Sequence, residues 1–108
     1  MRIRRVLIFT LLVAVTIIAS CTRGAEVKVS MKNFLYIPAE VTIKRGDGVI
    51  WTNDDIEPHT VTTADWDSGA INPGESYSRT FDTAGTFEIY CVFHAGMVEK
   101  VIVTQPGD

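Results

Sequence analysis

The side chains best suited to bind a metal lie in two short segments of this chain. Cys91, His94 and Met97 follow one another at three-residue intervals in the run YCVFHAGM, and His59 lies upstream, directly after Pro58. The 108 residues contain two cysteines and two histidines, and both histidines belong to this set. A thiolate, a thioether and two imidazoles are soft or borderline ligands of the kind that bind transition metals. The sequence therefore predicts a metal site formed by these residues.

The spacing of the downstream residues requires the backbone to turn after Cys91. On a β-strand, residues three apart point to opposite faces, so Cys91, His94 and Met97 can meet only in a tight loop. Gly96 favours such a loop because glycine adopts backbone angles that are closed to other residues. The upstream histidine follows a proline whose fixed φ angle gives it a stiff support. We expect two loops at one end of a rigid β fold to bring the ligands together.

The ligand types favour copper. Two imidazoles and a thiolate with a nearby thioether are the ligand set of a blue-copper electron-transfer site. A structural zinc site would use a further Cys or His instead of Met97, and a Cys/His nucleophile pair is disfavoured because both residues share one loop with Met97. Chance is the alternative for each residue alone, since a lone methionine usually fills a core. We predict one Cu(I)/Cu(II) ion per chain and no catalytic residue.

Residues 1–20 have the pattern of a secretory signal peptide. Three arginines precede an apolar run over residues 6–19 that is too short for a comfortable membrane span. Small residues and Cys21 follow, which resembles a bacterial lipobox, in which the cysteine carries lipid. We predict a lipid anchor on Cys21 and a location in the periplasm or on the outer face of the cell membrane. The alternatives are an ordinary signal peptide cut near Cys21 and an uncleaved anchor.

A lipidated Cys21 would leave Cys91 without a disulfide partner in an oxidising compartment. A metal would protect that thiol, whereas a Cys21–Cys91 disulfide or a buried inert thiol is the alternative. Without residues 1–20 the chain has seven basic and thirteen acidic residues, a net charge of −6. This balance argues against nucleic acid as a partner and fits a cationic protein partner.

The rest of the chain has the pattern of an all-β domain. Short alternating segments are separated by turn signals, and no stretch has convincing helical periodicity. We predict a β-sandwich or barrel of seven to eight strands over residues 26–104, after a tether at residues 21–25 and before a tail at residues 105–108. The expected strand segments are residues 26–31, 41–43, 49–53, 60–63, 76–81, 86–91 and 99–104.

At these residues the chain resembles a small cupredoxin of the plastocyanin/amicyanin group. The resemblance spans about residues 26–104 and is carried by NFLYIPAEVTIKRGDGVIWTN, EPHTVTT, NPGESYSRTFDTAGTFEIYC and CVFHAGMVEKVIV. The short C-x-x-H-x-x-M loop is similar to the amicyanin variant rather than to the longer plastocyanin loop. The resemblance implies a Greek-key β-sandwich, with copper bound by His59, Cys91 and His94 and axially by Met97. It also implies single-electron shuttling between membrane or periplasmic redox proteins.

The residues expected to support the ligands include both matches to the family pattern and departures from it. Asn53 matches the family's Asn at the end of the tryptophan strand. Thr60 follows the first copper histidine where Asn is frequent, and its hydroxyl is the candidate to brace the ligand loops instead. Phe87 stands where a tyrosine is common, so that hydroxyl is missing, and Ala95 replaces a frequent proline, which loosens the loop. We expect Asn53, Pro58 and Thr60 to surround the ligands.

Two surface positions are candidate points of electron entry. We expect His94 to expose one ring edge, with Phe93 and Ala95 beside it as a docking patch for a redox partner; ordinary loop packing is the alternative. Tyr90 precedes Cys91 and should point outward by strand alternation. In plastocyanins the matching tyrosine marks a second docking surface, and a plain exposed aromatic is the alternative here. Candidate redox partners are a c-type cytochrome or a membrane oxidoreductase. We expect this chain to be a monomer.

Three other functions remain open. A copper oxidase or nitrite reductase needs further metal centres, for which the chain has no spare histidines. A copper carrier or buffer usually offers exposed Met and His clusters, whereas these ligands are expected on a closed hairpin. A metal-free adhesive sandwich domain would bind no copper stoichiometrically.

Overall fold

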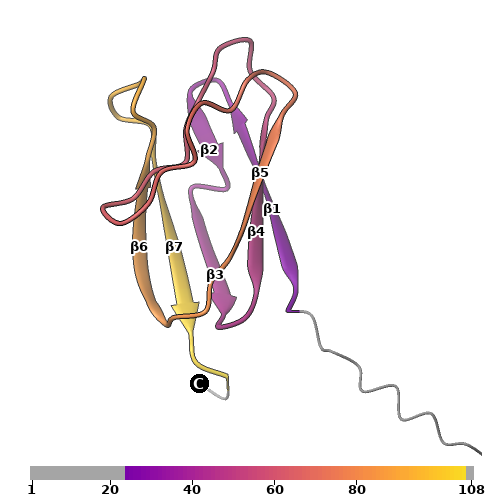
Figure 1. Cartoon of the computed structure of the whole chain (residues 1–108), viewed down its shortest axis with the longest axis vertical. Helices are drawn as coiled ribbons and strands as arrows, with labels where there is room; N and C mark the ends of the chain where they lie inside the picture. The colour runs from indigo at the N-terminus through magenta and orange to yellow at the C-terminus, as the bar shows by residue number, and fades with distance from the viewer. Residues whose placement is uncertain (1–23, 107–108) are drawn as a thin grey trace, which may run out of the picture.

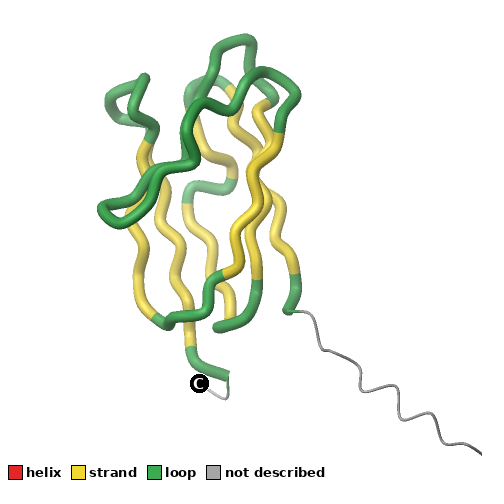
Figure 2. Tube along the Cα trace, viewed as in Figure 1, coloured by secondary structure: helices red, strands yellow, loops and turns green. Residues whose placement is uncertain are grey.

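Two packed β-sheets form the part of the chain that the computed structural model describes, residues 24–106 (Figure 1). Loops and turns connect seven strands, and the described residues contain no helix (Figure 2). They are β1 (Glu26–Lys32), β2 (Leu35–Ile37), β3 (Glu40–Lys44), β4 (Gly48–Asn53), β5 (Ser76–Thr80), β6 (Gly85–Tyr90) and β7 (Val98–Thr104). The predicted all-β sandwich is confirmed. The predicted signal peptide and the lipidated Cys21 lie outside the described residues.

The strand order brings three connections to the same end of the sandwich. One sheet has the order β2-β1-β4-β5 and the other β3-β7-β6. β1 and β4 run parallel with Met31 opposite Asn53, so the β1–β2 turn lies beside the start of the long β4–β5 connection. β6 and β7 form an antiparallel hairpin whose loop lies at this end too (Figure 1). An isolated bridge between Thr62 and Tyr90 ties the β4–β5 connection to β6. Residues distant in sequence therefore share one pole of the molecule.

The core follows the predicted alternation. The inward-pointing residues of two strands are buried: Val49, Trp51 and Asn53 on β4, and Val101 and Val103 on β7. Fully burying one such apolar side chain stabilises a fold by about 1.5–3 kcal/mol, so this alternating set holds the two sheets together. The loops at the pole are thus attached to a rigid base.

The prediction of a strand over residues 60–63 is wrong. This segment forms isolated bridges only, through Thr62. Its first two backbone amides bond to side chains instead of to a neighbouring strand: the amide of Thr60 donates to Sγ of Cys91 at 3.4 Å, and that of Val61 donates to Oγ of Ser68 at 2.8 Å. The amide of Thr62 alone bonds to β6, through the carbonyl of Tyr90 at 3.0 Å. A ladder cannot continue where successive amides are used in this way. The departure from regular pairing occurs beside the predicted metal ligands.

Candidate metal centre

His59, Cys91 and His94 come together at the pole. One potential ligand atom from each residue lies within 4.8 Å of the others, and Nδ1 of His59 is 3.8 Å from Sγ of Cys91. His59 comes from the β4–β5 connection, whereas the other two residues lie in the β6–β7 loop. His59 and Cys91 are buried, and His94 is partly exposed. Two separate loops therefore meet as the spacing predicts.

Met97 closes the ligand loop. Its amide donates to the carbonyl of His94 at 3.3 Å, and its carbonyl accepts the amide of Cys91 at 3.1 Å. Gly96 has a φ of 84°, in the left-handed region that glycine adopts freely. The Met97 side chain is 1% exposed. The loop thus turns as expected and directs the thioether to the interior at this end.

Both histidine rings use Nε2 for contacts with the protein. Nε2 of His59 lies 2.7 Å from Oδ2 of Asp55, and Nε2 of His94 lies 3.3 Å from the carbonyl oxygen of Pro58. Metal-binding histidines commonly engage an oxygen with one ring nitrogen, which orients the ring and leaves the other nitrogen for the metal. In both rings the nitrogen left for a metal is Nδ1. Pro58 supports the site through its carbonyl as well as through its fixed backbone angle.

Asp55 is a site residue that sequence reasoning missed. Burial alone would raise its pKa, but hydrogen bonds from the Phe34 amide, His59 and the Asn33 amide outweigh that effect and hold the pKa below its usual value. The carboxylate therefore stays charged beside His59. Its only signal in the sequence is an acidic run, DDIE, which reads as an ordinary polar loop.

Thr60 connects both ligand loops. Its Oγ1 accepts the amide N–H of Val92 at 2.9 Å, and its own amide donates to the Cys91 sulfur at 3.4 Å. Its carbonyl accepts the buried hydroxyl of Tyr36 at 2.5 Å. Burial raises the pKa of Tyr36 far above its usual value, with the Cys91 and Glu99 charges adding to the effect, so this hydroxyl remains a donor. Tyr36 of β2 thus supplies a hydroxyl that braces the site. Phe87 has no hydroxyl and cannot supply one.

Asn53 organises the start of the β4–β5 connection. Its side-chain amide donates to the carbonyls of Glu57 and Ile71 at 2.7 and 2.8 Å, and its Oδ1 accepts the amide of Asp55 at 2.9 Å. A fully buried polar side chain is tolerated because its hydrogen-bonding groups are satisfied. Asn53 thereby shapes the loop that carries His59.

The surface around His94 is apolar. Phe93 and Val92 are 52% and 50% exposed, and Ala95 is also exposed. Phe34, from the β1–β2 turn, adds a ring whose centroid lies 4.7 Å from that of His94. Sequence reasoning missed this residue, because the turn is 60 positions earlier in the chain. Tyr90 points outward and is 43% exposed, as alternation predicts.

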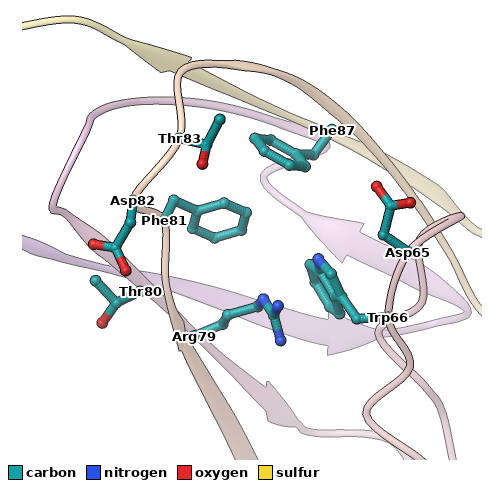
Figure 3. Close-up of a pocket in the computed structure, with 8 residues that line it drawn as sticks. All are labelled: Asp65, Trp66, Arg79, Thr80, Phe81, Asp82, Thr83 and Phe87. Atoms are coloured by element: carbon teal, nitrogen blue, oxygen red, sulfur yellow. The ribbon is translucent and has the colours of Figure 1, made fainter.

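A separate pocket lies on the side of the sandwich (Figure 3). Its wall includes Trp66, Phe81 and Phe87, and the guanidinium of Arg79 lies 4.1 Å from the Trp66 ring centroid. None of the potential metal ligands lines it. Trp66 packs against the core.

The donor set fits copper. The buried sulfur of Cys91 accepts a backbone N–H from Thr60, and one nitrogen of each imidazole lies within 4.8 Å of it. Thiolate and imidazole together suit both oxidation states of copper. The fit rests on the residues themselves, which present soft donors in a site closed to most solvent.

Comparisons with known proteins agree with this site. Residues 23–104 match the family of copper binding proteins described as the plastocyanin/azurin family. A chloroplastic plastocyanin from Tetradesmus obliquus is 39% identical over 103 residues, covering 80% of this chain and 71% of that protein. An amicyanin from Paracoccus versutus is 33% identical over 84 residues, covering 71% and 64%.

Solved structures agree as well. The crystal structure of amicyanin from Paracoccus versutus superposes with a TM-score of 0.68 at 32% identity, covering 72% of this chain and 80% of that one. The predicted resemblance is thus confirmed, and family, fold and the His/Cys/His cluster together support a copper electron-transfer protein. The chain belongs to the plastocyanin/azurin family of copper-binding proteins, with one copper ion as its cofactor.

Proposed function

We propose that this protein carries single electrons outside the cytoplasm through one blue-copper site. His59, Cys91 and His94 would hold the ion, and Met97 would add a weaker thioether ligand. The observation that carries the proposal is the convergence of two imidazoles and a buried sulfur, within 4.8 Å, from two loops at one pole. No role in substrate turnover is proposed.

The surroundings of the cluster favour fast electron exchange. Copper, when bound, supplies a one-electron couple. The protein keeps His59 and Cys91 away from water, and the backbone bonds between Cys91 and Met97 hold the loop closed. Because the ligands are held in place, the site would move little when copper changes oxidation state, which favours fast electron exchange. His94 is the partly exposed member, so we propose that electrons enter or leave through its ring edge, with Phe93 and Ala95 as part of the docking patch.

The proposed partners are redox proteins, with a c-type cytochrome or a membrane oxidoreductase as candidates. Tyr90 is a second proposed docking point, supported by its exposure on β6. The leader pattern and the lipobox-like end at Cys21 support lipid anchoring on the periplasmic or outer face of a membrane. The chain is proposed to act as a monomer. In residues 24–106, the structure has no helix with the length and apolar character to cross a bilayer.

A visible spectrum and a redox titration of the copper-loaded chain test the proposed function. We expect one copper per chain, an intense thiolate-to-copper absorption and a reversible one-electron step. Electron exchange should be much faster than copper exchange with a chelator. Fast copper exchange with slow electron exchange would instead identify a copper carrier or buffer, and absence of stoichiometric copper would identify a metal-free domain.

A further inference from the structure

Asp55 joins one metal-site histidine to a turn from another part of the chain. Its Oδ2 lies 2.7 Å from Nε2 of His59 and accepts the amide of Phe34 at 3.0 Å, while Oδ1 accepts the amide of Asn33 at 2.8 Å. Its own amide donates to Asn53 at 2.9 Å. One carboxylate thus connects the β4–β5 loop to the β1–β2 turn, and all of these bonds act on groups near the copper site.

The turn that Asp55 holds is conformationally strained. Asn33 and Phe34 have φ angles of 54° and 59°, in the left-handed region. Asparagine visits this region readily, whereas a bulky residue such as phenylalanine is an outlier there. Strain of this kind persists only where surrounding contacts hold it, and it clusters at functional sites. Here the Asp55 carboxylate fixes the amides of both strained residues.

The strained backbone places the Phe34 ring against both histidines. Its centroid lies 5.8 Å from that of His59 at an interplanar angle of 85°, and 4.7 Å from that of His94 at 74°. Edge-to-face packing at these distances is favourable for aromatic rings. Phe34 is nevertheless 47% exposed. The ring therefore lies between solvent and the histidine pair and contributes little to the core.

We propose that Asp55 and the strained turn of Asn33 and Phe34 form a clamp that fixes both imidazole rings in their metal-binding orientation and slows copper release. Asp55 orients His59 through Nε2, which directs Nδ1 toward Cys91. Phe34 restricts rotation of the His94 ring, which lies in an outer loop and whose hydrogen-bond contact within residues 24–106 is a long one, to the Pro58 carbonyl at 3.3 Å. Asp55 and Phe34 are positioning residues, and the copper part of the clamp rests on the proposed ligand set.

Transfer of Cu(I) from the loaded full chain to an excess of bicinchoninate measures the clamp. We expect Asp55→Asn and Phe34→Gly each to release copper about tenfold faster, or more, as is usual when a residue orienting a metal ligand is replaced. Phe34→Tyr keeps the ring and should release copper at nearly the original rate. Asp54→Asn makes the same charge change one residue away, on a carboxylate bonded to Ser30, and should also leave the rate unchanged.

Stability separates positioning from a general loss of structure. Glycine adopts φ near 59° without strain, which offsets the lost ring contacts and the larger backbone entropy of the unfolded glycine variant. Phe34→Gly should therefore change the Tm of the metal-free chain only slightly although it accelerates copper release. The double variant Asp55→Asn/Phe34→Gly should release copper no faster than the faster single variant, because both act through one clamp. The proposal would be overturned if the double variant accelerated copper release by the product of the two single effects. It would also be overturned if Asp54→Asn and Asp55→Asn had equal effects.

NMR of the metal-free chain tests the clamp without copper. The chain has two histidines, so their ring signals are readily assigned. We expect NOEs between the Phe34 ring and both imidazoles, and loss of the His94 NOEs in Asp55→Asn. Missing NOEs in the unmodified protein refute the clamp, whereas NOEs in a chain that binds no copper refute the proposed function instead.

Discussion

Trp51 and Glu99 are joined across the interior of the sandwich. The indole Nε1 of Trp51, on β4, donates to Oε1 of Glu99, on β7, at 2.7 Å. Glu99 is 3% exposed, and its Oε2 has no hydrogen-bond partner among the described residues. Burial raises the pKa of Glu99 to about 7, although the bond from Trp51 lowers it. A protonated carboxyl in the core, two residues after Met97, is therefore favoured below neutral pH.

The first prediction concerns pH and stability. The folded-state pKa of Glu99 is raised from 4.5 to about 7, so the folded chain keeps a proton that the unfolded chain loses. The stability that this bound proton contributes is fully present below pH 4.5. It is lost as the pH rises to about 7, which lowers the free energy of unfolding by at most about 3 kcal/mol. Glu99→Gln keeps an acceptor for Trp51 but does not titrate. In urea titrations of the metal-free chains, the variant should gain relative stability across this range; a pH-independent difference would contradict the assignment.

The second prediction concerns the thiolate. Cys91→Ser should abolish the intense visible absorption of the copper form, because that absorption is a charge transfer from sulfur to Cu(II). Cys21→Ser removes the other cysteine of the chain and serves as the matched control, with an unchanged spectrum expected. An unchanged spectrum in Cys91→Ser would refute the proposed ligand set.

The third prediction concerns the axial position. Met97→Leu should retain copper and raise the reduction potential, because an alkyl group removes a weak donor and lowers local polarity, and both changes favour Cu(I). A tenfold shift of the couple corresponds to about 59 mV, which sets the expected scale. Met31→Leu, at a fully buried core methionine on β1, is the control and should leave the potential in place. Complete loss of copper from Met97→Leu would argue against a weak axial role.

The fourth prediction concerns Thr60. Thr60→Val keeps the shape but leaves the amide of Val92 without its acceptor, which should cost about 1–3 kcal/mol of unfolding free energy and shift the potential. Thr60→Ser keeps the hydroxyl and should cost clearly less. Urea denaturation and redox titration of both variants provide the comparison. Equal behaviour of the two variants would mean that the hydroxyl does not brace the ligand loops.

Much of the fold follows from local pattern. Alternation places Val49 and Trp51 inward, and turn signals separate the strands, because a strand with one buried face must repeat every two residues. The same alternation puts Glu99 on the face of Val101 and Val103, yet a charged residue there gives no reason to expect burial. Only the packing of β4 against β7 reveals the partner, Trp51, that makes this burial tolerable.

The chemistry of the site is likewise divided between sequence and tertiary structure. By itself the sequence determined the residue types and the spacing of Cys91, His94 and Met97, and therefore the soft metal that they suit, because ligand softness is a property of the side chains. Tertiary structure alone decided how the rings are held: the β1–β2 turn, remote in the chain, packs the Phe34 ring against His59 and donates the Phe34 amide to Asp55, which lies four residues before His59. Such contacts depend on loop paths at one pole of two packed sheets, and no local periodicity encodes them.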